Sequence, residues 1–244
     1  TPLLEAFLYT HIDSDLAKQR LEFCIDSIRI QHFGQQILDW KAKDSSDLIL
    51  PHVYIAQIKY PDVKPEHLRE QIESLRLDAW LEFHYDLTSF EKVKILNYIL
   101  FQLHGFRANE ADFLNPDNSY FNQVLNTKKG NPIALSIVYI LVAQRLNIPV
   151  YGINLPRHFI MAYVEDQETE NLDHFNDKQS ISHIAKGEIK FYINAYNGGG
   201  VFNQEQLSNI IKEMGLVNTP INSIGAKNNF ILQCIPGIQK ICSQ

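Results

Sequence analysis

Apolar side chains recur at helical spacing through the first part of the chain. Ser14 and the segment Thr88-Ser89-Phe90-Glu91 have residues typical of helix starts, and Pro65 suits the first turn of a helix. Gly34 is expected to end the first helix. Before the middle of the chain, the pattern predicts helices at 14–33, 47–59, 65–83, 92–103 and, after a turn at 115–118, 119–126.

The most apolar helix is predicted to begin at Pro132. Asn131 can accept a hydrogen bond from a free backbone N–H of that helix, and Pro132 lacks the N–H that the first position cannot use. Apolar residues from Ile133 to Leu146 cover nearly every face, which predicts a central, buried helix. The run is shorter than the about 20 apolar residues that a bilayer requires, so no membrane span is expected here.

The pattern then changes to alternation and predicts strands. Val150–Leu155 forms the first of these, and a second apolar run, Phe159–Val164, follows His158. A third strand is expected at Ile189–Ala195, before the turn Asn197-Gly198-Gly199-Gly200. The sequence predicts a last helix at 203–214, ended by Gly215.

This order of elements is typical of Cys-His-Asp/Asn enzymes. Their thiol lies at the start of a buried helix, where the helix dipole and an imidazole lower its pKa, and a third residue orients the imidazole. His158 and Asn194 fit the second and third roles. Each also has a structural interpretation: a lone histidine beside an apolar strand is often a packed residue, and Asn194 precedes a turn that asparagine favours.

Motifs in a fixed order resemble the transglutaminase-like proteins of the SirB (invasion regulator B) type, which are widespread in bacteria and related to a domain of some eukaryotic F-box proteins. The resemblance covers about residues 45 to 217. Its motifs are Ile58-Lys59-Tyr60-Pro61-Asp62, Leu96-Asn97, Gly105-Phe106, Asn109, Asn118-Ser119-Tyr120, Asn122, Val124-Leu125, Gly130-Asn131-Pro132-Ile133, Leu135-Ser136, Arg145-Leu146, Ile148-Pro149, Gly152, Pro156, His158-Phe159 and Asn197-Gly198-Gly199.

The resemblance implies an α+β fold of the transglutaminase-like, papain-like cysteine-protease type. A central buried helix would pack on an antiparallel sheet, after a helical region. We expect the helical region at 1–103, the core at 104–217 and a tail at 218–244, which the resemblance implies to be the start of tetratricopeptide-like helices. Because family members generally keep the histidine and aspartate but lack the cysteine, the resemblance implies a degenerate site.

Pro132 occupies about the position of the enzymes' cysteine, and proline has no nucleophile. Arg157 replaces the family's usual glycine, and Asn194-Ala195 replaces its Asp-Pro, although asparagine can still orient an imidazole. Ser136 is a weak alternative nucleophile, because buried helical hydroxyls commonly bond back to a carbonyl. None of Cys24, Cys234 and Cys242 lies at a helix start before His158.

Composition argues against several classes of function. The chain has 22 Lys+Arg against 28 Asp+Glu, a formal net charge of −6, which argues against a broad nucleic-acid surface. Three widely spaced cysteines favour a reducing cytoplasm, and no signal segment is seen at the start. The nine histidines lack a metal-binding spacing, so neither a metal nor another cofactor is expected.

Three functions stay open at this stage. We favour a non-catalytic protein that binds a protein or peptide through the degenerate cleft, with the polar segment 165–188 as a lid or partner-binding loop. A hydrolase or acyltransferase using His158 and Asn194 is the alternative, and a module that only positions further helices is the third. The binding candidates are Asn131, Ser136, Asn154, Arg157, His158, Asn194, Tyr196 and Asn197.

Overall fold

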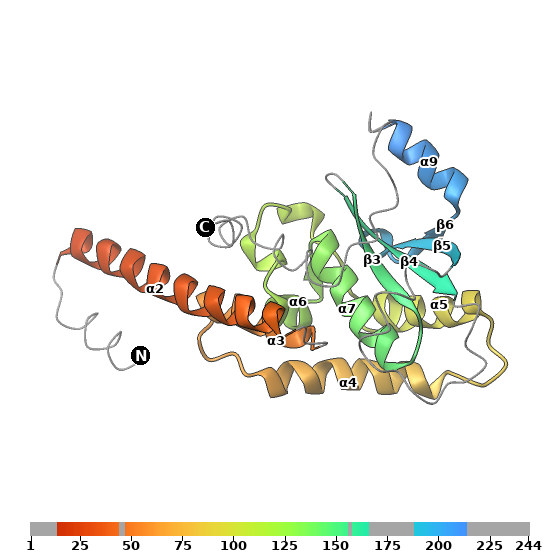
Figure 1. Cartoon of the computed structure of the whole chain (residues 1–244), viewed down its shortest axis with the longest axis horizontal. Coiled ribbons are helices and arrows are strands. Elements are labelled where there is room, and N and C mark those ends of the chain that lie inside the picture. Colours follow the sequence, from red (N-terminus) through yellow and green to blue (C-terminus); the bar gives the residue numbers. More distant parts are fainter. Residues whose placement is uncertain (1–13, 44–46, 156–157, 166–187, 214–244) are drawn as a thin grey trace.

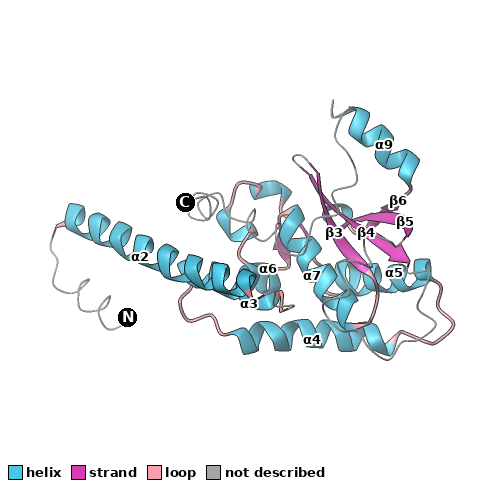
Figure 2. Ribbon diagram, in the orientation of Figure 1, coloured by secondary structure: helices cyan, strands magenta, loops and turns pink. Residues whose placement is uncertain are grey.

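A computed structural model describes residues 14–43, 47–155, 158–165 and 188–213. Within these ranges the chain is α+β: helices occupy the first part, and a four-stranded antiparallel sheet follows in the second (Figures 1 and 2). The predicted fold class is therefore confirmed. The expected boundaries at residues 103 and 217 remain predictions, and Arg157, the segment 166–187 and the tail from 214 lie outside the described residues.

The described residues up to Leu103 form four α-helices. They are α2 (Asp15–Ala42), α3 (Ile49–Lys59), α4 (Pro65–Leu81) and α5 (Ser89–Asn97), the last continuing as a π-helix over Tyr98–Leu103. Figure 1 shows α2 extending away from the other elements, with the sheet on the opposite side of the molecule.

The prediction that Gly34 ends the first helix is wrong, because α2 runs on to Ala42. Gly34 is buried in α2 together with Ile37 and Trp40, and the Trp40 indole nitrogen donates to the Asp47 carbonyl at 2.8 Å. Glycine costs a helix interior about 1 kcal/mol. Burial of the isoleucine and tryptophan side chains outweighs that cost.

Short elements lead from the helices to the core. The two-residue strands β1 (Arg107–Ala108) and β2 (Lys129–Gly130) pair in parallel. Between them lie two 3₁₀ turns, Glu110–Asp112 and Pro116–Asn118, and helix α6 (Phe121–Thr127). The predicted turn and short helix therefore both form.

The central helix is α7 (Pro132–Arg145), and the sequence predicts its start at the observed residue. All ten residues from Ala134 to Ala143 are buried. The sheet has the order β3-β4-β5-β6, with strands β3 (Val150–Leu155), β4 (His158–Glu165), β5 (Glu188–Asn194) and β6 (Gly200–Phe202). Helix α9 (Gln204–Glu213) follows β6.

Side chains of β4 alternate between two apolar clusters. Phe159, Met161 and Tyr163 join the large cluster that contains α7 and the N-terminal helices. Ile160, Ala162 and Val164 join a smaller cluster with Leu207 and Ile211 of α9. The sheet thus separates α7 from α9, and this separation decides which candidate residues meet.

Candidate functional site

The start of α7 is closed by the chain's own polar groups. The Asn131 side-chain oxygen accepts from the backbone N–H of Ala134 at 2.8 Å, and its side-chain nitrogen donates to the Ser119 hydroxyl at 2.8 Å. The Asn131 backbone N–H donates to the Asn118 carbonyl at 3.0 Å. Pro132 occupies the first turn of the helix. Asn131 therefore acts here as a helix cap that fixes the helix start.

Ser136 is fully buried one turn further along α7. Its hydroxyl donates to the Pro132 carbonyl at 2.8 Å. A serine nucleophile needs a base that removes its proton, whereas this proton is held by a backbone carbonyl inside the core.

His158 and Asn194 lie together at one end of the sheet. Leu155 at the end of β3 pairs with His158 at the start of β4, and β5 ends at Asn194 on the other side of β4. Both residues line a hollow of about 450 Å³ between this end of the sheet and α9. His158 is exposed at the first position of β4.

The lining of the hollow combines apolar and polar residues. Its other lining residues are Leu155, Ile160, Asn197, Gly200, Val201, Phe202, Gln206, Leu207, Asn209 and Ile210. Neither Pro132 nor Ser136 belongs to this lining. His158 shares the strand face of Ile160, which packs in the α9 cluster, whereas its neighbour Phe159 packs in the α7 cluster. The imidazole and the start of α7 are thus presented on different faces of the sheet.

Asn194 also forms a local turn. Its side-chain oxygen accepts from the backbone N–H of Tyr196 at 3.0 Å, at the start of the 3₁₀ turn Ala195–Asn197. The Tyr196 ring packs edge-on against Phe113, with 6.4 Å between ring centroids, so it turns toward the first part of the chain. The turn-forming interpretation of Asn194 therefore holds alongside its position in the hollow.

The remaining candidate residues lie in different places. Asn197 is exposed and lines the hollow. Asn154 lies in β3 opposite Phe159. Cys24, the one free cysteine of the described part of the chain, is exposed on α2.

The α9 wall of the hollow is absent from the sequence-based candidates. Leu207, Ile210 and Ile211 follow helical spacing, and this stripe could have indicated that the predicted last helix packs on the sheet. The sequence does not reveal which face of the sheet it covers.

Within the described ranges the chain has neither a metal-binding cluster nor a membrane-spanning helix. No group of three or more His, Cys, Asp or Glu side chains is arranged there to hold a metal ion. None of the helices in those ranges has both the length and the apolar character needed to cross a bilayer.

Comparisons with known proteins agree with the fold. The model of the transglutaminase-like superfamily matches residues 66–229. A UPF0162 protein of Xylella fastidiosa (strain 9a5c) is 30% identical over 168 residues, which cover 64% of this chain and 55% of the relative. A UPF0162 protein of Pasteurella multocida (strain Pm70) is 30% identical over 94 residues, covering 38% of this chain and 36% of that protein.

A eukaryotic relative matches a smaller part. F-box only protein 21 of Mus musculus is 36% identical over 81 residues, or 33% of this chain and 13% of that protein. The chain spans about half the length of the first UPF0162 relative, and no solved structure matches the chain.

Proposed function

The chain belongs to the transglutaminase-like superfamily, and we propose that it is a non-catalytic member that binds a protein or peptide in the hollow beside His158. The proposal is supported by Pro132, which starts α7 and which the resemblance places at about the position of the enzymes' cysteine. Without an attacking atom, covalent acyl transfer has no first step.

The environment of Ser136, whose hydroxyl lies one turn after the start of α7, supports the same proposal. Ser136 is buried, bonded to the Pro132 carbonyl and absent from the lining of the hollow. The described thiol, Cys24, belongs to α2, which extends away from the sheet in Figure 1. A nucleophile for His158 is therefore missing from the described residues around the hollow.

The hollow itself has the character of a binding site. Binding sites for small molecules and peptide side chains are concave and mostly apolar, with a few polar groups that fix orientation. Leu155, Ile160 and Leu207 supply apolar surface here, while His158 and Asn194 supply polar groups. An apolar peptide side chain next to a backbone amide would match this arrangement.

Selection from a displayed peptide library tests the binding proposal. We expect selected peptides to lose at least about ten-fold in affinity on His158→Ala, because one lost hydrogen bond and its packing contribute about 1.5 kcal/mol. His84→Ala, which removes another exposed histidine, serves as the matched control and should bind normally. Selected peptides that bind both variants equally would contradict the assignment to this hollow. If changes in 165–188 alone abolish binding, recognition belongs to that segment instead.

An activity assay tests the alternative function, since His158 and Asn194 share one hollow. The chain is incubated with a glutamine-containing protein and a fluorescent primary amine, and separately with an activated ester. We expect neither amine incorporation nor ester hydrolysis above the rate of buffer. Turnover that disappears in His158→Ala but persists in His84→Ala would overturn the non-catalytic proposal in favour of a hydrolase or acyltransferase.

A further inference from the structure

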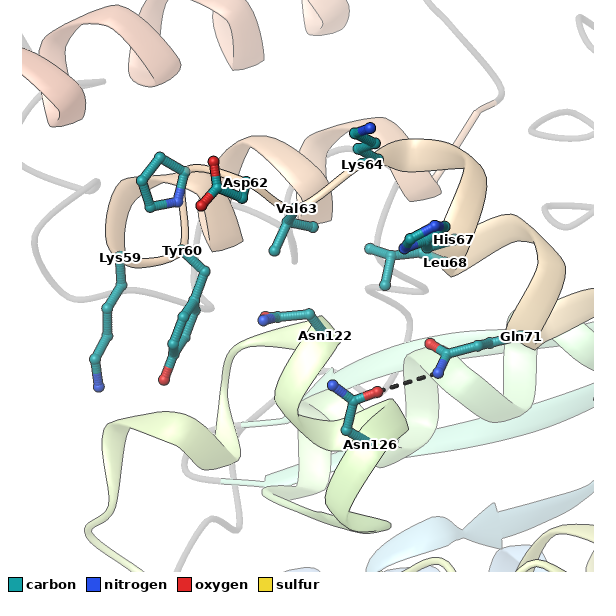
Figure 3. A pocket seen from close by; sticks show the side chains of 11 residues that line it. Lys59, Tyr60, Asp62, Val63, Lys64, His67, Leu68, Gln71, Asn122 and Asn126 are labelled. Carbon is teal, nitrogen blue, oxygen red and sulfur yellow. Dashed lines mark hydrogen bonds between the residues drawn. The ribbon is translucent and has the colours of Figure 1, made fainter. Parts of the chain in front are cut away.

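A second pocket lies in the helical part of the chain, away from the sheet. It has a volume of about 410 Å³ and is bounded by the connection between α3 and α4, the first turns of α4 and helix α6. Figure 3 shows the side chains that line it. None of them lines the hollow beside His158, so a ligand here would be independent of the proposed function.

Asn122 is the unusual residue of this pocket. Its side chain is only 8% exposed, and its buried side-chain oxygen has no hydrogen-bond partner in the described structure. In Figure 3 the amide extends from α6 into the space below Val63, toward Tyr60. A buried polar group without a partner costs about 1–3 kcal/mol, so such groups need an explanation.

Another buried asparagine provides the comparison. Asn118 is 4% exposed, and its side-chain oxygen accepts from Asn109 at 2.8 Å. Its side-chain nitrogen donates to the carbonyls of Asp112 and Phe113 at 2.8 and 3.2 Å. The fold therefore satisfies one buried amide fully while leaving the other open toward a pocket. A hydrogen-bond donor from a ligand would complete Asn122.

Lys64 and His67 lie at one end of the same pocket, and the acidic residue of the first turn of α4, Glu66, does not line it. Lys64 and His67 line it and are exposed, and neither has an ion-pair partner among the described residues. Helix α4 begins beside them, and its N-cap residue Lys64 provides no side-chain cap, so the first N–H groups and the helix dipole add positive potential. This end of the pocket favours an anion.

At the other end of the pocket the positive charge of Lys59 is already paired. Lys59 binds Asp117 with its ammonium group 2.8 Å from the carboxylate, and the Tyr60 hydroxyl donates to the same oxygen at 2.7 Å. The acidic lining residue Asp62 lies on the Lys59 side in Figure 3, apart from His67. An anionic group is therefore directed toward Lys64 and His67.

We propose that this pocket binds a carboxylate that has an amide N–H beside it, as at the C-terminus of a peptide or in an N-acylated amino acid. The carboxylate would pair with Lys64 and His67, and the neighbouring amide N–H would donate to the Asn122 oxygen. Leu68 and Val63 supply an apolar surface for the side chain of the terminal residue. The volume suits one or two residues, and not an extended polymer.

Four small probes test the proposal by their effect on the amide NMR signals of the nitrogen-labelled chain. They are acetyl-Gly-Ala-Leu with a free carboxylate, the same peptide with a C-terminal amide, N-acetyl-leucine and inorganic phosphate. We expect the free acid to shift signals of 60–71 and 121–127 and to bind at least about ten-fold more tightly than the amidated peptide, because a charge-assisted hydrogen bond is lost.

Each probe outcome has a meaning. N-acetyl-leucine that binds as tightly as the peptide supports the proposal and identifies the N-acyl amino acid as the sufficient ligand, whereas weaker binding indicates a peptide C-terminus. Phosphate that matches the free acid overturns the proposal, because the site then recognises charge alone. An absence of shifts at millimolar peptide also overturns it, as does equal binding of the acid and the amide.

Variants separate binding from folding. Asn122→Leu keeps the number and branching of the side-chain heavy atoms and removes the unpartnered oxygen, so we expect peptide binding to fall at least about ten-fold while the melting temperature stays equal or rises. Gln123→Leu changes the next residue of α6, which does not line the pocket, and should leave binding unchanged. Lys64→Gln should weaken binding of the free acid but not binding of the amidated peptide. Binding that survives Asn122→Leu would contradict the assigned role of the asparagine.

Discussion

At the scale of single residues, His52 links the stability of the fold to pH. The residue is buried on α3, and its Nδ1 lies 2.6 Å from the Leu48 carbonyl. Its Nε2 has no partner in the described structure, and its ring packs against Phe121 with 5.3 Å between centroids. Burial lowers the pKa of His52 from 6.5 to about 4, because the charged imidazole would be desolvated.

The sign of the pH effect follows from that lowered pKa. The unfolded chain takes up a proton on His52 near pH 6.5, whereas the folded chain resists protonation until about pH 4. The contribution of the neutral His52 to the free energy of unfolding is therefore fully present above pH 6.5, and about 3 kcal/mol of it is lost as the pH falls to about 4. Urea unfolding of the wild type and of His52→Leu at several pH values measures this loss as their difference. If the free energy of unfolding changes equally with pH in both proteins, the role of His52 is contradicted. His84→Ala should keep the pH dependence of the wild type.

At the scale of elements, two helix starts form a matched pair. The Thr88 hydroxyl accepts from the Glu91 backbone N–H, and the Glu91 carboxylate accepts from the Thr88 backbone N–H at 2.8 Å, which completes a capping box. Ser14 occupies the N-cap of α2 without a side-chain hydrogen bond. We expect Thr88→Ala to lower the free energy of unfolding by about 1 kcal/mol and Ser14→Ala to change it little. Equal losses, measured by urea denaturation, would refute this difference.

The turn between β5 and β6 supplies a second matched pair. Gly198 and Gly199 both have positive φ, at 57° and 77°. A Cβ on Gly199 would lie 2.1 Å from the side-chain oxygen of Asn97, whereas one on Gly198 would meet no atom within 4 Å. The Asn97 side-chain nitrogen also donates to the Gly199 carbonyl at 2.7 Å, which ties α5 to this turn.

Alanine at these two glycines should therefore have unequal effects. Gly198→Ala bears only the left-handed backbone strain, about 1 kcal/mol, while Gly199→Ala must also displace Asn97 and should cost at least about twice as much. Thermal unfolding followed by circular dichroism measures both. A Gly199→Ala protein as stable as Gly198→Ala would show that the α5 contact yields without cost.

Elements with a strong local pattern are the ones that the sequence predicts well. The start of α7 follows from Asn131 and Pro132, and its burial follows from an apolar run that leaves no polar face. The end of α2 does not follow from the sequence, because tertiary burial of Ile37 and Trp40 outweighs the local effect of Gly34. The change to a π-helix at Tyr98 also has no local signal, and the predicted helix 92–103 spans both forms.

At the scale of the whole molecule, the sheet determines which candidate side chains share a face, and the sequence alone does not predict this. The order of the motifs predicts that His158 and Asn194 lie near the start of the central helix, and the strand pairings place these two residues at the same end of the sheet. Which face each side chain occupies depends on the register of β4 and on where α9 packs. A one-residue difference in register exchanges the faces, so this information lies in long-range packing and not in any local motif.

The same division predicts two units of different stability. The large cluster joins α7 to the N-terminal helices, whereas α9 contacts the other face through a small cluster that includes Leu207, which is 1% exposed. Removing three carbons from Leu207 should leave a cavity that loosens α9 and β6, while α7 keeps its contacts. Hydrogen exchange read by mass spectrometry should therefore show faster exchange of 200–213 in Leu207→Ala, with 132–145 unchanged.

The control for this prediction lies in the large cluster. Val142 is fully buried on α7, so Val142→Ala should speed exchange in α7 and in the N-terminal helices that pack against it. If Leu207→Ala accelerates exchange in 132–145 as much as in 200–213, the two faces of the sheet unfold together and the hollow beside His158 belongs to the main core. If only α9 responds, the wall of the hollow can open without loss of the core, which gives a bound peptide a route into it.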